Sequence, residues 1–231
     1  MTVIVEDTST RQRPAPVFTG RVRWVAAALV VTGAALQVAE FLFEPGGNAA
    51  AADRINWWLA HPDRIALSKA AGMLAVPFLL GQLFVMVTIA RRHSRRVATA
   101  AAVFVTAAMT GLAAIQGVEM AAWWAARAGN RDAAVAILDV SNPGLPGAVL
   151  FVQFLGGALF GTVLLNIALW RSPSVPRLVV VFGVGFVIMD LVLGWGIAGH
   201  VSALAGGVVL AWAIITGYGR TPHQRRWMRA H

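Results

Sequence analysis

The chain has 231 residues, of which 58% are hydrophobic and 13% are charged, and its mean hydropathy is +0.69. Soluble domains carry about 25% charged residues, so this composition excludes an ordinary soluble protein and predicts that the lipid bilayer is the solvent. The absence of cysteine excludes disulfides, a thiolate nucleophile and a cysteine-bound metal. The formal net charge of +9 is spread over loops and tails and forms no single basic face, so we expect no nucleic-acid partner.

Six apolar runs are separated by polar segments, and each is at or near the roughly 20 residues that a membrane-spanning helix needs. A helix also satisfies its own backbone hydrogen bonds in lipid. The runs cover residues 22–43, 66–90, 97–126, 147–170, 178–198 and 200–217. We therefore predict an all-α fold, a six-transmembrane-helix bundle over residues 22–217, between a disordered cytoplasmic tail at 1–21 and a basic cytoplasmic tail at 218–231.

Arginine is concentrated on one side of the predicted membrane. Arginines precede the first run, lie between the second and third and between the fourth and fifth, and follow the sixth. Because basic loops stay in the cytoplasm, we predict a multi-pass protein of the bacterial inner (plasma) membrane with both termini cytoplasmic. Membrane lipids, whose anionic headgroups would face the basic side, are expected partners, and a homo-oligomer is left open.

The two longer loops on the opposite side each contain a candidate helix. Residues 48–60 are predicted to form an amphipathic helix that lies on the membrane surface. The side chains expected to dip into the interface are Ile55, Trp57, Trp58 and Leu59. A second short helix is predicted at residues 131–140.

Two runs contain nearly the same Gln-x-x-Glu motif, Gln37-Val38-Ala39-Glu40 in the first and Gln116-Gly117-Val118-Glu119 in the third. This predicts a hairpin repeat in which helices one and two resemble helices three and four. Helices five and six form a candidate third copy, in which Asp190 stands where the glutamates stand. Gly157 and Gly161 have the spacing that lets two membrane helices pack closely.

Three acidic residues lie within apolar runs: Glu40, Glu119 and Asp190. A charge in the membrane costs about 2.5–3.5 kcal/mol on insertion scales, so each is by default a functional candidate. At about 1.5 Å of rise per residue, all three fall between the bilayer centre and its outer boundary, and we expect them to share one interior pocket. Lys69 is the nearest candidate partner for Glu40 or Glu119. The alternatives are a helix-packing hydrogen bond for Asp190 and a place at the outer interface for the glutamates.

Other residues at a similar depth are candidates to line the same pocket. The polar candidates are Gln37, Gln116, Gln153 and His200, and the aromatic candidates are Trp123, Phe186 and Trp195. The 5 histidines do not cluster in the sequence, so neither a metal site nor another cofactor is expected.

Several short segments carry a resemblance: Val38-Ala39-Glu40-Phe41-Leu42, His61-Pro62-Asp63-Arg64, Gly117-Val118-Glu119, Ile167-Ala168-Leu169-Trp170-Arg171-Ser172 and Val175-Pro176-Arg177. On these segments the chain resembles a broad group of uncharacterised six-helix bacterial integral membrane proteins, which implies a fold and no function. In size, number of spans and acid-plus-aromatic core it resembles, more weakly, the small integral-membrane terpene cyclases. That likeness implies an enzyme whose embedded acids protonate an isoprenoid-type substrate.

Three functions are compatible with these features. In the enzyme hypothesis, which we prefer, Asp190 protonates an alkene or epoxide with Glu40 or Glu119 as its partner, and Trp195 and Phe186 stabilise the carbocation. In the second, the carboxylates serve a proton-coupled transporter or a binding protein for a lipid or small molecule. The third is a non-catalytic membrane subunit. The first two imply a hydrophobic small molecule as partner.

Overall fold

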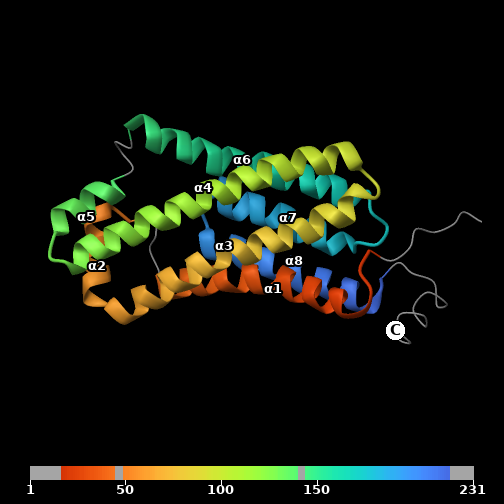
Figure 1. The fold of residues 1–231 in the computed structure, drawn as a ribbon, viewed down its shortest axis with the longest axis horizontal. Coiled ribbons are helices and arrows are strands. Elements are labelled where there is room, and N and C mark those ends of the chain that lie inside the picture. Colours follow the sequence, from red (N-terminus) through yellow and green to blue (C-terminus); the bar gives the residue numbers. More distant parts are fainter. Residues whose placement is uncertain (1–16, 45–48, 140–143, 219–231) are drawn as a thin grey trace, which may run out of the picture.

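The computed structural model describes residues 17–44, 49–139 and 144–218. Within these ranges all regular structure is helical, with eight α-helices, one π-helix and no strand (Figure 1). The elements are α1 (Gly20–Phe43), α2 (Ala51–Ala60), α3 (Pro62–Arg91), α4 (Arg95–Arg127), α5 (Arg131–Leu138), α6 (Gly144–Trp170), α7 (Arg177–Phe186), η1 (Val187–Val192) and α8 (Gly196–Thr216). The all-α prediction is confirmed.

Five helices are long and apolar enough to cross a membrane, which indicates a multi-pass membrane protein. They are α1, α3, α4, the segment Gly147–Trp170 of α6, and α8. Their positions match predicted runs one to four and six. The predicted tail at 1–21 lies outside the described residues up to residue 16, and α1 begins within it at Gly20. Residues 219–231 of the other predicted tail also lie outside the described residues.

The fifth predicted helix, residues 178–198, changes its hydrogen-bond pattern and ends at Val192, and it is not among the five candidate spans, so the count of six spans is not confirmed. α7 ends at Phe186 and continues as the π-helix η1. The Leu193 amide donates to the Ile188 carbonyl at 2.9 Å, which is the wider hydrogen-bond pattern of a π-turn. Apart from Asp190 the run is apolar, and its hydropathy did not reveal where the helix would change its pattern.

A glycine turn separates η1 from α8. Gly194 has φ +69°, a backbone conformation that glycine adopts at little cost. α8 then begins at Gly196, so the prediction that the last helix begins at His200 is wrong. His200 lies within the first turns of α8 and faces η1, with which α8 packs.

The helices form one elongated bundle (Figure 1). α2 and α5 lie together at one end, here named the α2–α5 end, while the first turn of α1 and the last turn of α8 lie at the other. α1 packs against α3 and α8, α4 packs against α3 and α6, and α7 packs against α8. The end of α1, the start of α3 and the end of α4 therefore meet at the α2–α5 end.

α4 and α6 approach each other closely at two glycines. A Cβ atom added to Gly157 would lie 2.7 Å from the Phe104 carbonyl oxygen and 2.7 Å from the Ala108 nitrogen. One added to Gly161 would lie 2.6 Å from the Val105 side chain. Small residues at this spacing let helix backbones meet, and the predicted close packing is confirmed.

α2 and α5 confirm that both predicted loop segments are helical, although α2 begins at Ala51 and α5 ends at Leu138, and residues 48 and 140 lie outside the described residues. They pack on the ends of α3 and α4 through a small separate core. Its buried members are Ile55, Trp58, Ile65, Ala122, Trp123, Ala126, Ala134 and Leu138. The prediction that Ile55 and Trp58 dip into the lipid interface is wrong, because both side chains are buried inside the protein.

Candidate functional site

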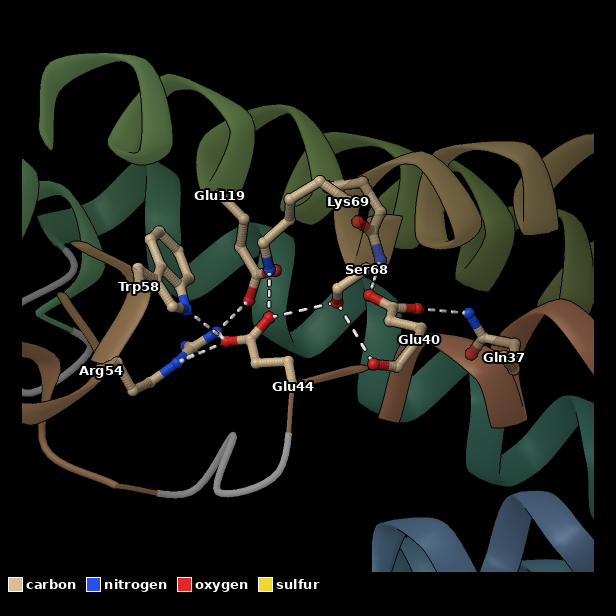
Figure 2. Close-up of polar contacts among 9 residues, drawn as sticks. Gln37, Glu40, Glu44, Arg54, Trp58, Ser68, Lys69 and Glu119 are labelled. Carbon is tan, nitrogen blue, oxygen red and sulfur yellow. Dashed lines mark hydrogen bonds and ion pairs between the residues drawn. The ribbon is translucent and has the colours of Figure 1, made fainter. Parts of the chain in front are cut away.

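Four charged side chains meet at the α2–α5 end and form what we name the ion cluster: Glu44, Arg54, Lys69 and Glu119 (Figure 2). Arg54 Nη2 lies 2.7 Å from Glu44 Oε1 and 2.9 Å from Glu119 Oε1. Lys69 Nζ lies 2.6 Å from Glu44 Oε2 and 2.5 Å from Glu119 Oε2. Each acid therefore contacts both bases, and the formal charges cancel within the cluster.

The ion cluster is buried and well hydrogen-bonded. The side chain of Lys69 is 1% exposed and that of Glu44 is 7% exposed. Trp58 Nε1 donates to Glu44 Oε1 at 2.8 Å, and Lys69 Nζ lies 4.6 Å from the centre of the Trp58 ring, a cation–π contact. Buried charges are tolerated when they are paired and hydrogen-bonded in this way.

Arg54 belongs to α2, outside the membrane-spanning helices. Burial lowers the pKa of its guanidinium, but the charges of Glu119 and Glu44 outweigh burial and hold that pKa above its ordinary value. Arg54 is therefore cationic at any pH at which the protein is studied. Through it, the cluster fastens α2 to the ends of α1 and α4.

Lys69 pairs with two acids of the ion cluster, of which only one was a predicted partner. Lys69 contacts Glu119, one of its two predicted partners, and it contacts Glu44 in place of Glu40. Glu119 is therefore held by two bases and is not the free pocket acid that we expected. Sequence reasoning missed Glu44 and Arg54. The available signal was the position of Glu44 one turn after Glu40, which places both acids on one face of the helix.

Glu40 lies one turn before the ion cluster and binds two glutamine amides. Gln37 Nε2 donates to Glu40 Oε2 at 2.8 Å, and Gln116 Nε2 donates to Glu40 Oε1 at 2.7 Å. Ser68 Oγ lies 3.2 Å from the Glu40 carbonyl oxygen and 3.4 Å from Glu44 Oε2, between Glu40 and the cluster (Figure 2). The glutamines of both Gln-x-x-Glu motifs therefore bind the same carboxylate, that of Glu40.

Asp190 of η1 and His200 of α8 form a second pair of ionisable side chains. Asp190 Oδ1 lies 3.7 Å from His200 Nδ1. His200 Nδ1 also lies 2.7 Å from the Gly196 carbonyl oxygen, and His200 Nε2 lies 3.0 Å from Gln37 Oε1. Both of these oxygens accept hydrogen bonds, so both bonds form together only when both ring nitrogens carry a hydrogen.

Glu40, its two glutamines and the Asp190–His200 pair line a cavity of about 420 Å³ inside the bundle. Six predicted site residues line it: Gln37, Glu40, Gln116, Phe186, Asp190 and His200. Most of the remaining lining is apolar, but it includes the amide side chains of Gln82 and Asn166, which sequence reasoning missed although each lies in an apolar run. Small-molecule sites typically measure about 300–1,000 Å³, so the cavity has the size of a ligand site.

Four predicted site residues do not line this cavity, and Glu119 is one of them. Gln153 Nε2 instead donates to a backbone carbonyl of α4 at 3.3 Å. Trp123 is buried against Trp58 in the core beneath α2 and α5, with ring centres 6.3 Å apart. Trp195 is 60% exposed, because it lies in the turn that follows the break in the fifth predicted helix.

In the described part of the chain, no three His, Cys, Asp or Glu side chains are grouped so that they could hold a metal ion. In comparisons with known proteins, no family model, no curated protein and no solved structure matches the chain. The chemistry of the cavity is therefore the guide to function.

Proposed function

We propose that the protein is a membrane-embedded enzyme that protonates a hydrophobic, isoprenoid-type substrate in the cavity and so starts its cyclisation. The observation that carries this proposal is that the Asp190–His200 pair faces a largely apolar cavity between the helices. A general acid must lie within reach of the reacting atom. An apolar site that excludes water also strengthens the electrostatic effect of such a pair.

In the proposed step, the π electrons of a substrate double bond take a proton from the Asp190–His200 pair, and a C–H bond forms. The positive charge stays on the substrate, and a second double bond attacks it to close a ring. A C–H bond next to the cationic carbon of the ring product then breaks, a double bond forms there and the proton returns to the pair, so the substrate is isomerised without an oxidant or reductant. Phe41 and Phe186 support this chemistry, because their ring centres lie 4.5 and 5.6 Å from that of His200 and aromatic rings stabilise cations.

Gln37 and Glu40 act in this proposal as positioning residues. Glu40 accepts a hydrogen bond from the Gln37 amide nitrogen, which turns the Gln37 carbonyl oxygen toward His200 Nε2. That contact fixes the ring of His200 and favours a hydrogen on Nε2. Phe41 takes the cation-stabilising place that the sequence suggested for Trp195.

The experiment that tests this proposal compares isosteric variants of the pair. Membranes that contain the wild type, Asp190→Asn or His200→Gln would be incubated with prenylated quinols or indoles, and the products analysed by mass spectrometry. We expect cyclised product from the wild type and about 100-fold less from either variant, because a positioned general acid contributes about that factor or more. Gln153→Leu, a change outside the cavity lining, is the control. Cyclised product unaffected by both changes would refute the enzyme proposal.

A proton-coupled carrier is the second candidate, and a different observation favours it. Asp190 lies in the π-helix that ends the fifth predicted helix. π-Turns within helices are frequent at functional sites, and carboxyl groups inside the membrane are common in proton-coupled transporters. Proton flux into vesicles, reported by a pH-sensitive dye, should then depend on Asp190 and Glu40. Flux that is indifferent to Asp190→Asn and Glu40→Gln would exclude the carrier, and the absence of both turnover and flux would favour a non-catalytic subunit.

The α2–α5 end is proposed to face the outside of the cell, with both termini in the cytoplasm. Support comes from the arginines at the opposite end, where the connection between α3 and α4 holds Arg91, Arg92, Arg95 and Arg96. Cytoplasmic connections are enriched in such residues. The ion cluster and α2 would then cover the outer end of the cavity.

A further inference from the structure

The helices around the cavity form a closed ring. Each packs against the next in the order α1, α3, α4, α6, α7 and α8, and α8 packs against α1. η1 continues α7 in this ring. At every one of these contacts a glycine of one helix lies against the neighbouring helix: Gly33, Gly72, Gly157, Gly183, Gly185 and Gly207. Small residues let helices meet closely, so each contact closes the wall of the cavity at its own level.

Both ends of the cavity are obstructed. At the end opposite α2 and α5, Leu165, Val179 and Leu210 line the cavity and belong to the buried apolar core that joins the helices. At the α2–α5 end, the hydrogen bond from Gln116 to Glu40 crosses from α4 to α1, and the ion cluster lies beyond it (Figure 2). These groups leave the wall of the ring as the route for a ligand.

The contact between α6 and the segment formed by α7 and η1 closes only part of the wall. α6 packs mainly against α4 and only lightly against α7 and η1. The seam is closed where Asn166 lies against Gly183, and Val187, one turn further along, is still buried. Beyond it come Leu155 of α6 and Leu191 of η1, which both line the cavity. They lie about 16 and 12 Å along their helices from the Asn166–Gly183 contact, and therefore at a similar level.

Leu155 connects the cavity with the surface of the bundle. Of the residues that line the cavity, all of which belong to the described part of the chain, only Leu155 is exposed, and its exposed fraction is 49%. Leu191 on the other side of the seam is half-buried. A residue that both lines a cavity and is exposed marks the place where the cavity reaches the surface. We name this place, between Leu155 and Leu191, the side opening.

The side opening lies within the apolar part of the bundle. Leu155 precedes Trp170, the last residue of the candidate span in α6, by 15 residues. This is about 22 Å of a hydrocarbon layer about 30 Å thick. The exposed side chains beside the opening are also apolar: Val152 on α6, and Ile188 and Val192 on η1. The side opening therefore faces lipid chains.

We propose that the side opening admits lipid-soluble molecules from the bilayer, so that the cavity takes its ligand from the membrane and not from water. The ligand enters as an apolar chain that passes between two leucine side chains. A charged or strongly hydrated group does not pass, because moving it into apolar surroundings without hydrogen-bond partners is costly. That this ligand is the substrate rests on the proposed function, whereas the route can be measured without turnover.

The test follows entry into the cavity. The full chain in phosphatidylcholine nanodiscs receives a long-chain alcohol with a diazirine at its chain end, and samples are irradiated at increasing times after addition. Mass spectrometry measures labelling of Leu79 and Leu83, which line the cavity from α3. We expect Leu155→Trp to slow this labelling about tenfold, because the larger side chain fills the opening. Val149→Trp, at an exposed position of α6 outside the cavity lining, should keep the wild-type rate.

A second comparison uses the wild type alone and needs no variant to fold. A small diazirine that carries a sulfonate group should label the exposed Asp132 but neither Leu79 nor Leu83. Equal labelling of the cavity by both probes, or labelling that Leu155→Trp does not slow, would overturn the inference and leave the proposed function standing. Entry that depends on Leu155 without any cyclised product would refute the enzyme and leave the route standing.

Discussion

Gln116 of α4 donates a hydrogen bond to Glu40 of α1 over 2.7 Å, so the glutamine of one Gln-x-x-Glu motif binds the glutamate of the other. Gln37 donates to the second oxygen of the same carboxylate at 2.8 Å. Glu40 therefore connects two membrane-spanning helices and holds the residue that orients His200. The same carboxylate therefore holds α1 against α4 and positions the polar side chains that line the cavity.

Exchanging the two partners tests this contact. In Glu40→Gln, residue 40 no longer offers a carboxylate oxygen to both amides, and we expect the variant to lose about 1–3 kcal/mol of stability. The double variant Glu40→Gln/Gln116→Glu again places a carboxylate opposite an amide and should recover most of that loss. Thermal unfolding in detergent, analysed as a double-mutant cycle, measures both effects. A double variant no more stable than the single one would contradict the contact.

Lys69 should be the most sensitive residue of the ion cluster. Lys69→Met leaves Glu44 and Glu119 with a single buried counter-charge, and removing one partner of a buried pair costs about 3–5 kcal/mol. Adding Glu119→Gln removes the excess negative charge and should lessen the loss. The control is Arg131→Met at the same end, since Arg131 is 46% exposed and an exposed pair is worth less than about 1 kcal/mol. Equal effects of Lys69→Met and Arg131→Met on thermal unfolding would show that the cluster does not stabilise the fold.

The absence of cysteine makes the proposed orientation easy to test. Asp132 of α5 has a fully exposed side chain, and His93 in the connection between α3 and α4 is exposed at the other end of the bundle. In intact cells, a membrane-impermeant maleimide should label Asp132→Cys but should label His93→Cys only after the membrane is permeabilised. The reverse pattern would place the termini outside.

Two adjacent glycines of α6 make a matched pair for helix packing. A Cβ atom at Gly157 would meet the backbone of α4 at 2.7 Å, whereas one at Gly156 would have nothing within 4 Å. Gly157→Ala must push the helices apart, and we expect a loss of about 1–3 kcal/mol. Gly156→Ala should be neutral or should stabilise the helix by up to about 1 kcal/mol. Thermal unfolding of the two variants distinguishes these outcomes, and equal melting temperatures would contradict the close approach of α4 and α6.

Apolar length was enough to predict the spans α1, α3, α4, α6 and α8, because a helix that crosses lipid needs a long apolar sequence. The same signal failed for residues 178–198. Apart from Asp190 and the glycines, every residue in that segment suits lipid, and hydrophobicity does not show where α7 changes to a π-helix. Gly194 gave a local indication of a turn, since glycine tolerates a positive φ.

The level of a residue along the bundle could be predicted better than the face of the helix on which it lies. Counting along the helices placed Glu40, Asp190 and His200 at similar depth, and all three line one cavity. Glu119 has a similar depth but turns toward Lys69 and Arg54. That choice depends on how α2 folds back over the bundle, a long-range contact that no local pattern in the sequence reveals.

The most direct test of the Asp190–His200 pair is deuterium incorporation. Membranes equilibrated in heavy water exchange the proton of the pair for deuterium, and a prenylated quinol is then supplied as substrate. We predict that cyclised product from the wild type carries deuterium at the carbon that is protonated first, and that Asp190→Asn yields about 100-fold less of that product. Cyclised product that carries no deuterium, or that Asp190→Asn forms as fast as the wild type, would contradict the proposed proton transfer.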